Sequence, residues 1–337
     1  MKIAVDAMGG DYGPRITVEG ALSAARDFGL EVILVGAREL ILREVNRMGQ
    51  PQEGVTIVDA PEAIGMGERL RSFRRKKRSS IGVGAQLVKE GRADALVSTG
   101  NTAAVVTISQ RTLGNLRGVD RPALALLVPT QQGLTLLIDV GANANCRPHH
   151  LEQFAIMGKI FMANVLGRTE PRIGLMSIGE ERGKGNDLTK AAFERLETAP
   201  LNFIGNVEGK DIYSGKADII VSDGFTGNVA LKVSEGLVEN LQVMARGEIT
   251  RNLLARVGFF LMRRHLRRLF RKLDYAQYGG AHLLGVNGVC IIGHGRSNPT
   301  AVRNAVRLAR EYVRTGVTEK IEQEIARVGG AAEGVKA

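Results

Sequence analysis

Short apolar runs that alternate with helical stretches are the feature of this sequence that most restricts its fold. The runs are Ile3–Val5, Val32–Val35, Val55–Val58, Ala95–Val97, Leu124–Val128, Leu134–Ile138, Ile173–Met176, Ile219–Val221 and Val289–Ile292. Strands that alternate with helices predict a mostly parallel sheet with helices on both faces. In open α/β sheets ligands bind beyond the carboxyl ends of the strands, so we expect the turns that follow these runs to converge.

The composition agrees with an α/β fold. Glycine is unusually frequent, with 42 residues, whereas tryptophan is absent and aromatic residues reach only 4%. This favours many tight strand-to-helix turns over an aromatic-rich sandwich. The 337 residues can bury a substantial core, and no repeat, low-complexity segment or proline-rich linker divides them. We therefore predict one α/β catalytic domain over residues 1–330, with a basic amphipathic helical insertion at 248–273 and a C-terminal tail at 331–337.

The charge and the cysteine count restrict the partners and the compartment. The formal net charge of +11 at pH 7 attracts anionic partners: nucleic acid, anionic lipid or an acidic protein. Cys146 and Cys290 are too few for a disulfide framework and lack zinc-ligand spacing. The N-terminus enters a strand-like run without the features of a signal peptide, and no window holds about 18 uncharged apolar residues. We expect a cytoplasmic protein that does not span a membrane.

Four turns between a strand and a helix share small residues with hydroxyl or amide side chains. They are Ser98–Thr102, Asp139–Asn143, Gly183–Asn186 and Asp223–Asn228. Glycines let backbone N–H groups approach an anion closely, and a helix N-terminus adds a favourable dipole. Phosphate is therefore the ligand that these turns suit best. The alternative is that these side chains are ordinary helix N-caps, for which Ser, Thr, Asp and Asn are the usual residues. The recurrence of four such turns at strand ends favours an anion site for the set.

Nucleotide-binding fingerprints are missing. No G-x-G-x-x-G follows a strand, and the segment Gly179–Lys184 departs from a P-loop in its spacing and in the Gly185 that follows it. A small oxyanion held by scattered loops fits better than ATP or a dinucleotide. We expect no cofactor and no metal.

The sequence also lacks an obvious nucleophile. There is no G-x-S-x-G elbow, and neither cysteine lies in a nucleophile motif, which disfavours a covalent acyl-enzyme. If phosphate attacks an activated carbonyl directly, the protein need only position two substrates and stabilise the developing oxyanion. Lys184, Asn228 and backbone N–H groups are suitable donors. A thiol leaving group, with a pKa of about 8.5, departs without strong acid help.

Two candidate residues have plain alternatives. Lys184 stands between two glycines, where its ammonium could reach phosphate, but a surface lysine in a mobile loop explains the residue equally well. His294 follows the last apolar run and could donate to a carbonyl or phosphate oxygen, although such a histidine is often a hydrogen-bonded turn residue. Lys184, Asn228 and His294 are our candidate catalytic residues.

Ten segments, read in order, resemble the PlsX family of bacterial phosphate acyltransferases along almost the whole chain. They are Ala4–Asp11, Lys77–Ser80, Gly100–Thr102, Asp139–Asn143, Ile178–Glu181, Gly183–Asn186, Gly205–Gly209, Asp223–Asn228, Leu284–Gly288 and His294–Gly295. The resemblance implies a doubly wound α/β/α three-layer homodimer, related in fold to phosphate acetyltransferases and isocitrate dehydrogenases. It also implies transfer of a long-chain fatty acyl group from acyl carrier protein to inorganic phosphate. The acyl phosphate product then serves phospholipid synthesis, with a glycerol-3-phosphate acyltransferase downstream.

The turns and the resemblance together give the set of residues expected to bind phosphate or substrate. They are Asp6, Gly9, Gly10, Thr99, Gly100, Asn101, Thr102, Asp139, Asn143, Glu180, Asn186, Asp223 and Thr226. Two positions depart from the family pattern: Ala103-Ala104 stand where Gly-Ala is usual, and Arg78 stands where Asp is frequent. Neither change removes a proposed donor.

The segment 249–273 has no acidic residue and eight Lys or Arg. In its second half, after Gly258, six apolar residues recur at helical spacing and fall within an arc of about 100° on a helix, with arginines and a lysine on the other side. The six apolar residues are Phe259, Met262, Leu266, Leu269, Phe270 and Leu273. This pattern suits a helix in a membrane interface against anionic head groups. The alternative is a helix packed on the protein or across a dimer, but the arginines lack compensating glutamates, which favours the membrane. The family is also regarded as peripherally membrane-associated.

A second basic run, Arg69–Arg78, has seven cations in ten residues. Acyl carrier protein is strongly acidic, so a cationic patch near the site would steer its approach. We assign carrier docking to Arg74, Arg75, Lys76, Lys77 and Arg78. Membrane contact ranks second, and nucleic acid ranks last, since the run has a single aromatic residue and no nucleic-acid-binding motif accompanies it.

Two other functions stay open at the level of sequence. The chain could be a phosphate acetyltransferase relative that uses acyl-CoA, or a non-catalytic scaffold whose α/β body binds a metabolite while its basic helix binds lipid. Release of free carrier thiol that depends on phosphate separates an enzyme from a scaffold, and a comparison of CoA with carrier thioesters separates the two enzymes.

Overall fold

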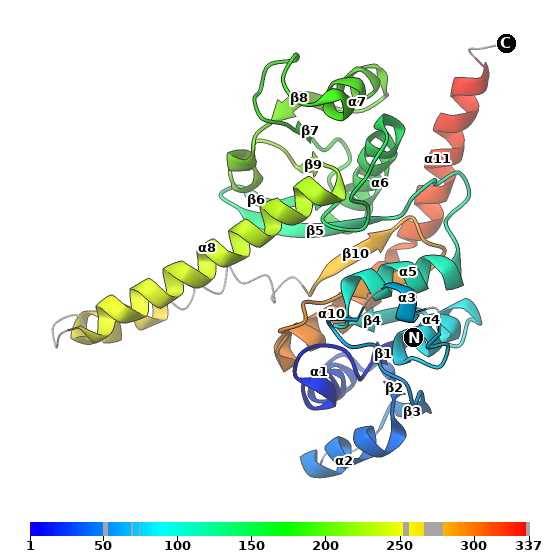
Figure 1. The fold of residues 1–337 in the computed structure, drawn as a ribbon, viewed down its shortest axis with the longest axis vertical. Helices are drawn as coiled ribbons and strands as arrows, with labels where there is room; N and C mark the ends of the chain where they lie inside the picture. The colour runs from blue at the N-terminus through cyan, green and yellow to red at the C-terminus, as the bar shows by residue number, and fades with distance from the viewer. Residues whose placement is uncertain (50–52, 69, 74, 252–255, 266–278, 335–337) are drawn as a thin grey trace.

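The computed structural model describes residues 1–49, 53–68, 70–73, 75–251, 256–265 and 279–334. Within these ranges one eleven-stranded sheet runs through the molecule in the order β3-β2-β1-β4-β11-β10-β5-β6-β9-β7-β8 (Figure 1). The strands are β1 (Lys2–Asp6), β2 (Glu31–Gly36), β3 (Val55–Asp59), β4 (Ala95–Ser98), β5 (Ala123–Thr130), β6 (Gly133–Ile138), β7 (Ile173–Met176), β8 (Phe203–Val207), β9 (Ile219–Val221), β10 (Ala281–Leu284) and β11 (Val289–Ile292). All nine predicted runs are strands. The sequence missed β8 and β10.

Helices cover both faces of the sheet, which confirms the three-layer α/β prediction. They are α1 (Gly13–Phe28), α2 (Arg38–Met48), α3 (Leu70–Phe73), α4 (Ser80–Lys89), α5 (Thr102–Leu113), α6 (Pro148–Leu166), α7 (Asp187–Thr198), the 3-10 helix η1 (Gly209–Tyr213), α8 (Gly224–Thr250), α10 (Pro299–Thr315) and α11 (Val317–Gly334). Residues 256–265 are also helical. Because α11 continues to Gly334, it extends into the segment predicted to be a tail.

The core shows the period-two alternation of buried strands. On β1, Ile3 and Val5 pack with α1 and α10, whereas Ala4 lies in the cluster on the opposite face with residues of α4 and α5. All three side chains are at most 1% exposed, as expected for a strand with helices on both sides. The sheet is therefore buried on both faces, and its ends are the accessible positions.

The strand directions divide the sheet into two halves. β1, β2, β3, β4 and β11 are parallel to one another, and so are β6, β7, β8 and β9. Three antiparallel pairings separate the halves: β11 with β10, β10 with β5, and β5 with β6. The second half therefore runs opposite to the first. The expectation that all the motif turns meet at one sheet edge is wrong, because the carboxyl ends of the two halves lie at opposite edges.

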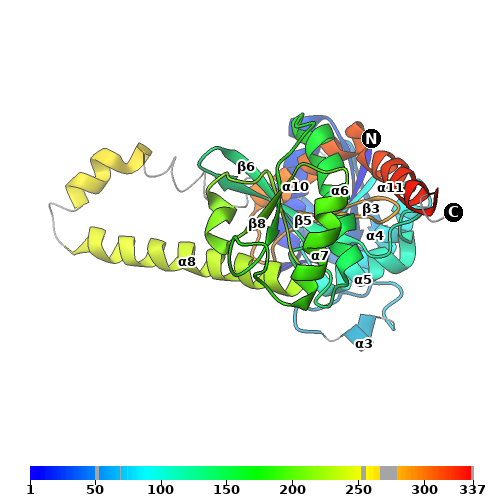
Figure 2. The ribbon, with the colours of Figure 1, turned by 90° about the horizontal axis from the view of Figure 1, so that it is seen from above.

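Helix α8 projects far beyond the sheet, with the helix at 256–265 beside its outer part (Figures 1 and 2). We call α8 and residues 256–265 the arm. The predicted membrane residues Phe259 and Met262 are 39% and 55% exposed. Leu266, Leu269, Phe270 and Leu273 lie outside the described residues. No helix in the described part of the chain is long and apolar enough to cross a bilayer.

His282 is an uncommon residue for the centre of a sheet. Its ring stacks on Tyr312 at 3.9 Å between centroids and lies edge-on to Phe161 at 5.2 Å. Neither ring nitrogen has a hydrogen-bond partner among the described residues. Burial lowers the pKa of His282 to about 3. The native ring is therefore neutral through the range in which an unfolded histidine, with a pKa of about 6.5, takes up a proton.

This buried histidine predicts a loss of stability in acid. Between pH 6.5 and pH 3 the unfolded state binds one proton more at this position, so the free energy of unfolding should fall by about 1.4 kcal/mol per pH unit. We expect His282→Phe to flatten the pH dependence by about this slope, measured by urea unfolding between pH 7 and pH 5. Tyr312→Phe perturbs the same stack without removing the histidine and should keep the wild-type slope. Equal slopes for wild type and His282→Phe would contradict the assignment.

Candidate active site

A cleft of about 410 Å³ lies between α8, the N-terminus of α5 and the turns that follow β1 and β11. Its polar lining residues are Asp11, Thr102, Asn228, Lys232, Glu235, Glu239, His294 and Arg296. Its apolar lining includes Met66, Leu124, Leu126, Val140, Leu231 and Ile292. Because α8 lines the cleft from Asn228 to Glu239, about three turns of helix border it. The cleft is thus elongated and amphipathic, with polar groups that come from both halves of the sheet.

The turns after β1 and β4 are held together by a buried carboxylate. Ser98 Oγ donates to Asp6 Oδ2 at 2.6 Å, and the backbone N–H of Met8 donates to Asp6 Oδ1 at 3.1 Å. A Cβ at Gly9 would lie 2.7 Å from both Asp6 Oδ2 and the backbone nitrogen of Gly100, so only glycine permits this approach. Burial raises the pKa of Asp6, against the opposing effect of its hydrogen bonds. Asp6 and Gly9 therefore shape the cleft wall from behind.

The same wall includes Gly10 and Thr99. Gly10 has φ of 86°, and a Cβ there would lie 3.0 Å from the carbonyl oxygen of Gly295. Asp11 also donates its backbone N–H to that oxygen at 2.8 Å. Thr99 is buried, and its hydroxyl has no partner among the described residues. The turns after β1, β4 and β11 therefore do converge, as predicted for this half of the sheet.

His294 belongs to a small charged network at this end of the cleft. Its Nδ1 accepts the backbone N–H of Arg296 at 3.2 Å, so the neutral ring carries its proton on Nε2. That atom lies 3.6 Å from Glu235 Oε2, which also accepts a 2.7 Å hydrogen bond from Lys232 Nζ. Burial alone would raise the pKa of Glu235, but His294 and Lys232 hold it below its usual value. The His294 ring therefore lies between an ionised carboxylate and the Lys232 ammonium, whose Nζ is 3.4 Å from His294 Nε2.

Lys232 and Glu235 were not predicted from the sequence. Both lie on α8 within two turns of Asn228, and Lys232 and Glu235 form an i,i+3 ion pair. The sequence signal that could have identified them is an i,i+3 pair of opposite charges on a helix that begins at a motif turn. On a helix of unknown orientation, however, such a pair is indistinguishable from an ordinary surface ion pair.

Asn228 lies in the second turn of α8 and faces the loop after β6. Its Nδ2 donates to the carbonyl oxygen of Val140 at 3.1 Å, and the described residues offer its side chain no other hydrogen bond. Gly227 makes this packing possible, because a Cβ there would lie only 2.0 Å from the carbonyl oxygen of Asp139. Asn228 therefore retains one amide proton and its oxygen for a group bound in the cleft.

Asp139 and Asn143 serve their own turn. Asp139 accepts hydrogen bonds at 2.8 to 3.0 Å from the backbone N–H groups of Leu124, Gly141, Ala142 and Asn143 and from Asn143 Nδ2. Asn143 Nδ2 also donates to the carbonyl oxygen of Pro122. Burial raises the pKa of Asp139, opposed by these donors. Because both carboxylate oxygens of Asp139 already accept hydrogen bonds from the protein, we infer that Asp139 shapes the loop that contacts Asn228.

The capping alternative holds for three of the predicted turn residues. Asn101 Oδ1 accepts the N–H of Ala104 at the start of α5, and Asn186 Oδ1 accepts the N–H of Thr189 at the start of α7. Asp223 caps α8 through the N–H groups of Phe225 and Thr226, and its Oδ2 accepts the Thr226 hydroxyl at 2.7 Å. These side chains are committed to helix starts. Thr102, at the first position of α5, lines the cleft.

Lys184 and Glu180 lie in the turn after β7, and neither is among the residues that line the cleft. Both are exposed. Glu180 pairs with Lys216 at 2.8 Å and with Lys210 at 3.6 Å, and the bond from Lys216 lowers its pKa. The structure therefore places Asn228 and His294 in one cleft and leaves Lys184 outside its lining. The catalytic role of Lys184 stays a prediction.

Some cations of the basic run, Arg69–Arg78, form ion pairs or hydrogen bonds within the protein. Lys76 Nζ contacts Glu68 at 2.5 Å and donates to the carbonyl oxygen of Ala63, and Arg78 lies 3.6 Å from Asp59. Arg75 and Lys77 are exposed and form no ion pair with a described residue. Arg74 lies outside the described residues. Of the predicted docking residues, Arg75 and Lys77 are the ones with uncommitted charge.

Neither cysteine is poised as a nucleophile. Burial, with a further contribution from Asp139, raises the pKa of Cys146 to about 11. Burial raises that of Cys290 to about 12. Since the thiolate is the reactive form, both thiols are inert near neutral pH.

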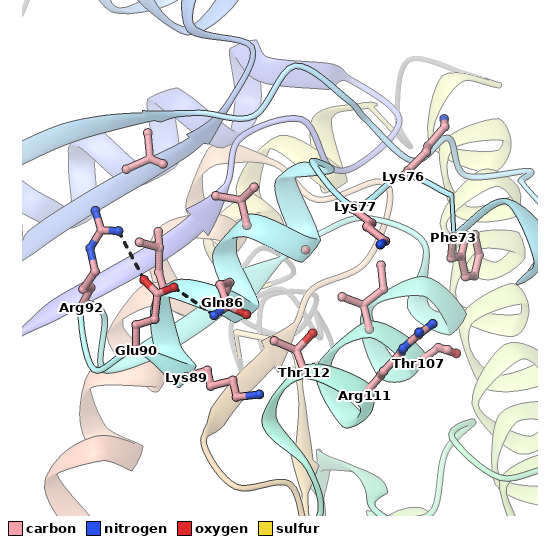
Figure 3. Close-up of a pocket in the computed structure, with 15 residues that line it drawn as sticks. Phe73, Lys76, Lys77, Gln86, Lys89, Glu90, Arg92, Thr107, Arg111 and Thr112 are labelled. Atoms are coloured by element: carbon pink, nitrogen blue, oxygen red, sulfur yellow. Dashed lines mark hydrogen bonds and ion pairs between the residues drawn. The ribbon is translucent and has the colours of Figure 1, made fainter.

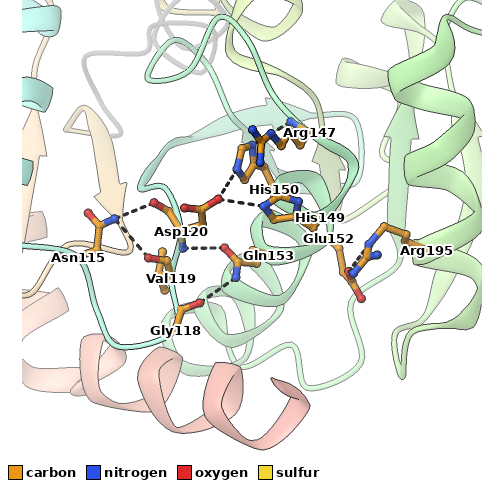
Figure 4. A network of polar contacts seen from close by, with 10 residues as sticks. All are labelled: Asn115, Gly118, Val119, Asp120, Arg147, His149, His150, Glu152, Gln153 and Arg195. Carbon is orange, nitrogen blue, oxygen red and sulfur yellow. Dashed lines mark hydrogen bonds and ion pairs between the residues drawn. The ribbon is translucent and has the colours of Figure 1, made fainter. Parts of the chain in front are cut away.

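Within the part of the chain that the structure describes, one group of side chains has metal-ligand character: Asp120, His149 and His150 (Figure 4). Asp120 Oδ2 lies 2.9 Å from His149 Nε2 and 2.7 Å from His150 Nε2, and these bonds lower the pKa of Asp120 to about 2. His150 Nδ1 accepts the backbone N–H of Arg147 at the start of α6, so its proton is on Nε2. A neutral ring in that state has no lone pair on Nε2 for a cation. The group instead fastens the loop before β5 to α6.

Comparisons with known proteins point to one family and one fold. A profile of the family described as "Fatty acid synthesis protein" matches residues 1–320. The "Phosphate acyltransferase" of Geobacter sulfurreducens is 46% identical over 326 residues, which cover 96% of this chain and 94% of the relative. That of Desulfitobacterium hafniense DCB-2 is 48% identical over 335 residues, 99% of this chain and all of the relative.

A phosphotransacetylase from Streptococcus pyogenes superposes with a TM-score of 0.63 at 17% identity, covering 93% of this chain and 94% of that one. The EutD phosphotransacetylase from Staphylococcus aureus has a TM-score of 0.60 at 14% identity over the same shares.

Proposed function

This chain belongs to the fatty acid synthesis protein family and is similar over nearly its whole length to proteins named phosphate acyltransferase; we propose that it moves a long-chain fatty acyl group from acyl carrier protein to inorganic phosphate. The proposed products are acyl phosphate and the free carrier thiol. A glycerol-3-phosphate acyltransferase would then consume the acyl phosphate in phospholipid synthesis. The transferase class follows from the family; the donor, the product and the mechanism are our proposal.

The amphipathic cleft is the observation that supports this reaction most strongly. Backbone N–H groups at the start of α5, Asn228 and the Nε2–H of His294 surround a space whose floor is Leu124, Leu126 and Val140. Helix N-termini and side-chain donors suit an oxyanion, and an apolar floor suits an acyl chain. A site for phosphate alone would not need the apolar floor.

We propose direct attack of phosphate on the thioester. A phosphate oxygen forms the new bond to the carbonyl carbon, and the resulting oxyanion is stabilised by donors of the cleft. Collapse breaks the carbon–sulfur bond, and the electron pair leaves with the carrier thiolate, which takes up a proton from water. The raised pKa of both thiols supports a route without an acyl-cysteine. Holding the two substrates together supplies most of the remaining rate enhancement.

The experiment that tests the donor compares thioesters of equal acyl length on acyl carrier protein and on CoA. We expect a substantially higher kcat/KM for the carrier substrate, because exposed cations near the cleft attract an acidic protein. A preference for CoA would favour the second candidate, a transferase closer to phosphotransacetylases, the named function of structural neighbours with the same fold. No turnover of either thioester would favour a non-catalytic scaffold.

We also propose that the arm contacts the inner face of the cell membrane, so that the cytoplasmic enzyme is peripherally bound. Residues 256–265 support this with exposed apolar side chains, Phe260 and Leu261 at 59% and 73%, beside Arg263 and Arg264. The guanidinium of Arg263 lies over the Phe260 ring at 4.3 Å. Apolar and cationic groups together suit an anionic lipid surface.

The arm predicts lipid binding that depends on its apolar residues. We expect Phe259→Glu/Met262→Glu to reduce flotation with phosphatidylglycerol vesicles by about tenfold or more, because two charges must then enter the interface. Lys190→Ala/Arg314→Ala lowers the net charge equally, far from the arm, and should float like wild type. Unchanged flotation of the arm variant would remove the membrane role.

The homodimer implied by the resemblance is likewise a proposal. Helix α8 carries exposed apolar residues at nearly four-residue intervals, which form one stripe along the arm: Phe225, Val229, Val233, Leu237, Leu241 and Met244. A stripe of this length is typical of a helix that packs on another helix. Sedimentation of the full chain as a monomer at all concentrations would contradict the proposal.

A further inference from the structure

A groove of about 480 Å³ lies on the outer surface of α4 and α5, apart from the cleft (Figure 3). The two helices flank β4 in the chain and pack against each other on one face of the sheet. Phe73, Lys76 and Lys77 line one end of the groove. The groove therefore has the form of a channel between two neighbouring helices.

The groove is connected to the cleft through α5. Thr102 at the start of α5 lines the cleft, whereas Thr107, Ile108, Arg111 and Thr112 line the groove. At 1.5 Å per residue these positions lie about 8 to 15 Å farther along the helix. A partner held in the groove would thus sit within one short flexible arm of the proposed reaction centre.

The floor of the groove is apolar and its rim is cationic. The floor is Val58, Phe73, Val83, Leu87 and Ile108. Lys77, Lys89 and Arg111 stand on the rim, and all three are exposed and form no ion pair with a described residue. Figure 3 shows Lys77 and Arg111 extending from different sides toward the middle of the groove.

The other charged residues of the groove are already committed. Lys76 is paired with Glu68, and Arg92 with Glu90. Glu90 is the one acidic residue among those that line the groove, and it also accepts a hydrogen bond from Gln86 at 2.9 Å. The charged groove residues that form no ion pair with a described residue are therefore all cationic.

A third helix fits this shape, since ridges of side chains pack into the groove between two helices. A helix with an apolar ridge flanked by Asp or Glu would bury the ridge on the floor and place its carboxylates beside the rim. A lipid bilayer suits the groove poorly because a broad surface cannot enter a concave channel. A bilayer instead suits a projecting apolar segment such as residues 256–265.

We propose that the α4–α5 groove docks an acidic amphipathic helix of the protein that carries the acyl group. This proposal rests on the proposed function, and it adds Lys89, Arg111 and the apolar floor to the predicted docking residues. Docking there leaves the start of α5 and the cleft free for the thioester arm. Rim charges speed and orient the encounter, and the floor retains the partner.

The test uses two groove variants of the full chain. Lys89→Glu/Arg111→Glu reverses the rim charge, and Thr112→Trp fills the channel without changing the charge. For each we expect the KM for acyl carrier protein to rise about tenfold or more, with kcat nearly unchanged at saturation. With acyl-pantetheine, which has no carrier, both constants should stay at wild-type values. Lys190→Glu/Arg314→Glu makes the same charge change on α7 and α10 and should leave the KM for the carrier unchanged.

Three outcomes would overturn the proposal. The KM for acyl carrier protein could stay unchanged in both groove variants. The KM for acyl-pantetheine could rise as much as the KM for acyl carrier protein, which would mean that the substitutions damaged the cleft. The variants could instead lose their binding to phosphatidylglycerol vesicles and still bind acyl carrier protein, which would make the groove a lipid-binding surface. Direct titration with acyl carrier protein tests docking even if no thioester is turned over, so failure of the groove and failure of the transferase are distinguishable.

Discussion

His294→Ala should lower kcat for acyl transfer by about a hundredfold, with the KM for phosphate and for the thioester changed much less. His294 lines the polar end of the cleft, and in the proposed mechanism its ring donates to the oxyanion that develops on the thioester carbonyl. Loss of one oxyanion donor typically costs a factor of about 100 or more. Steady-state release of free thiol from acyl carrier protein measures the effect.

The companion variants test the role of His294 as a hydrogen-bond donor. His294→Gln keeps a donor and should recover most of the rate, because the proposed role is stabilisation of the oxyanion. A rate as low as that of His294→Ala would contradict this role. Asn228→Ala should lower kcat more than tenfold, and Glu248→Gln, farther out on the arm, serves as the matched control. Wild-type rates in His294→Ala would remove this residue from the site.

Lys184→Ala is the decisive variant for the remaining sequence prediction. The cleft lining does not include Lys184. A loss of more than tenfold in its alanine variant would therefore require that the turn after β7 approach the cleft when substrate binds.

The strand positions could be read from the sequence because each run is continuous and apolar, as buried parallel strands require. The two strands that were missed lack this signature. β8 is interrupted by Gly205, whose φ is 92°, and by the polar Asn206. β10 follows Gly279 and Gly280 and contains His282, a residue that becomes acceptable in a core only because Tyr312 and Phe161 stack on it. That contact joins distant segments, and no local pattern reports it.

The convergence of the turns was predicted for the whole sheet and holds for half of it. The three antiparallel pairings around β10 and β5 reverse the second half. Periodicity reports that a segment is a strand and gives no information on its direction. Asn228 nevertheless meets the other half, because α8 crosses from one group of turns to the other.

The identity of the phosphate-site residues was harder to predict than their location. Asp6, Asp139 and Asp223 all accept hydrogen bonds from within the protein: Asp6 joins two turns, Asp139 holds its own turn and the start of β5, and Asp223 caps α8. The residue types that suggested a ligand therefore build the loops. Ser, Thr, Asn and Asp serve both purposes with the same chemistry. Residues whose side chains line the cleft, such as His294, could be distinguished from these only once their neighbours were known.

The central claim is that orthophosphate attacks the thioester directly within the cleft. The most direct measurement is the release of carrier thiol from long-chain acyl carrier protein, with and without phosphate and with no metal or nucleotide added. Acyl phosphate in the same samples is trapped with hydroxylamine. We predict that release falls by about a hundredfold or more without phosphate, because the nucleophile is then absent. With phosphate, each thiol released should be matched by one acyl phosphate. Equal release without phosphate, or a stoichiometric burst of thiol before phosphate is added, would contradict the account.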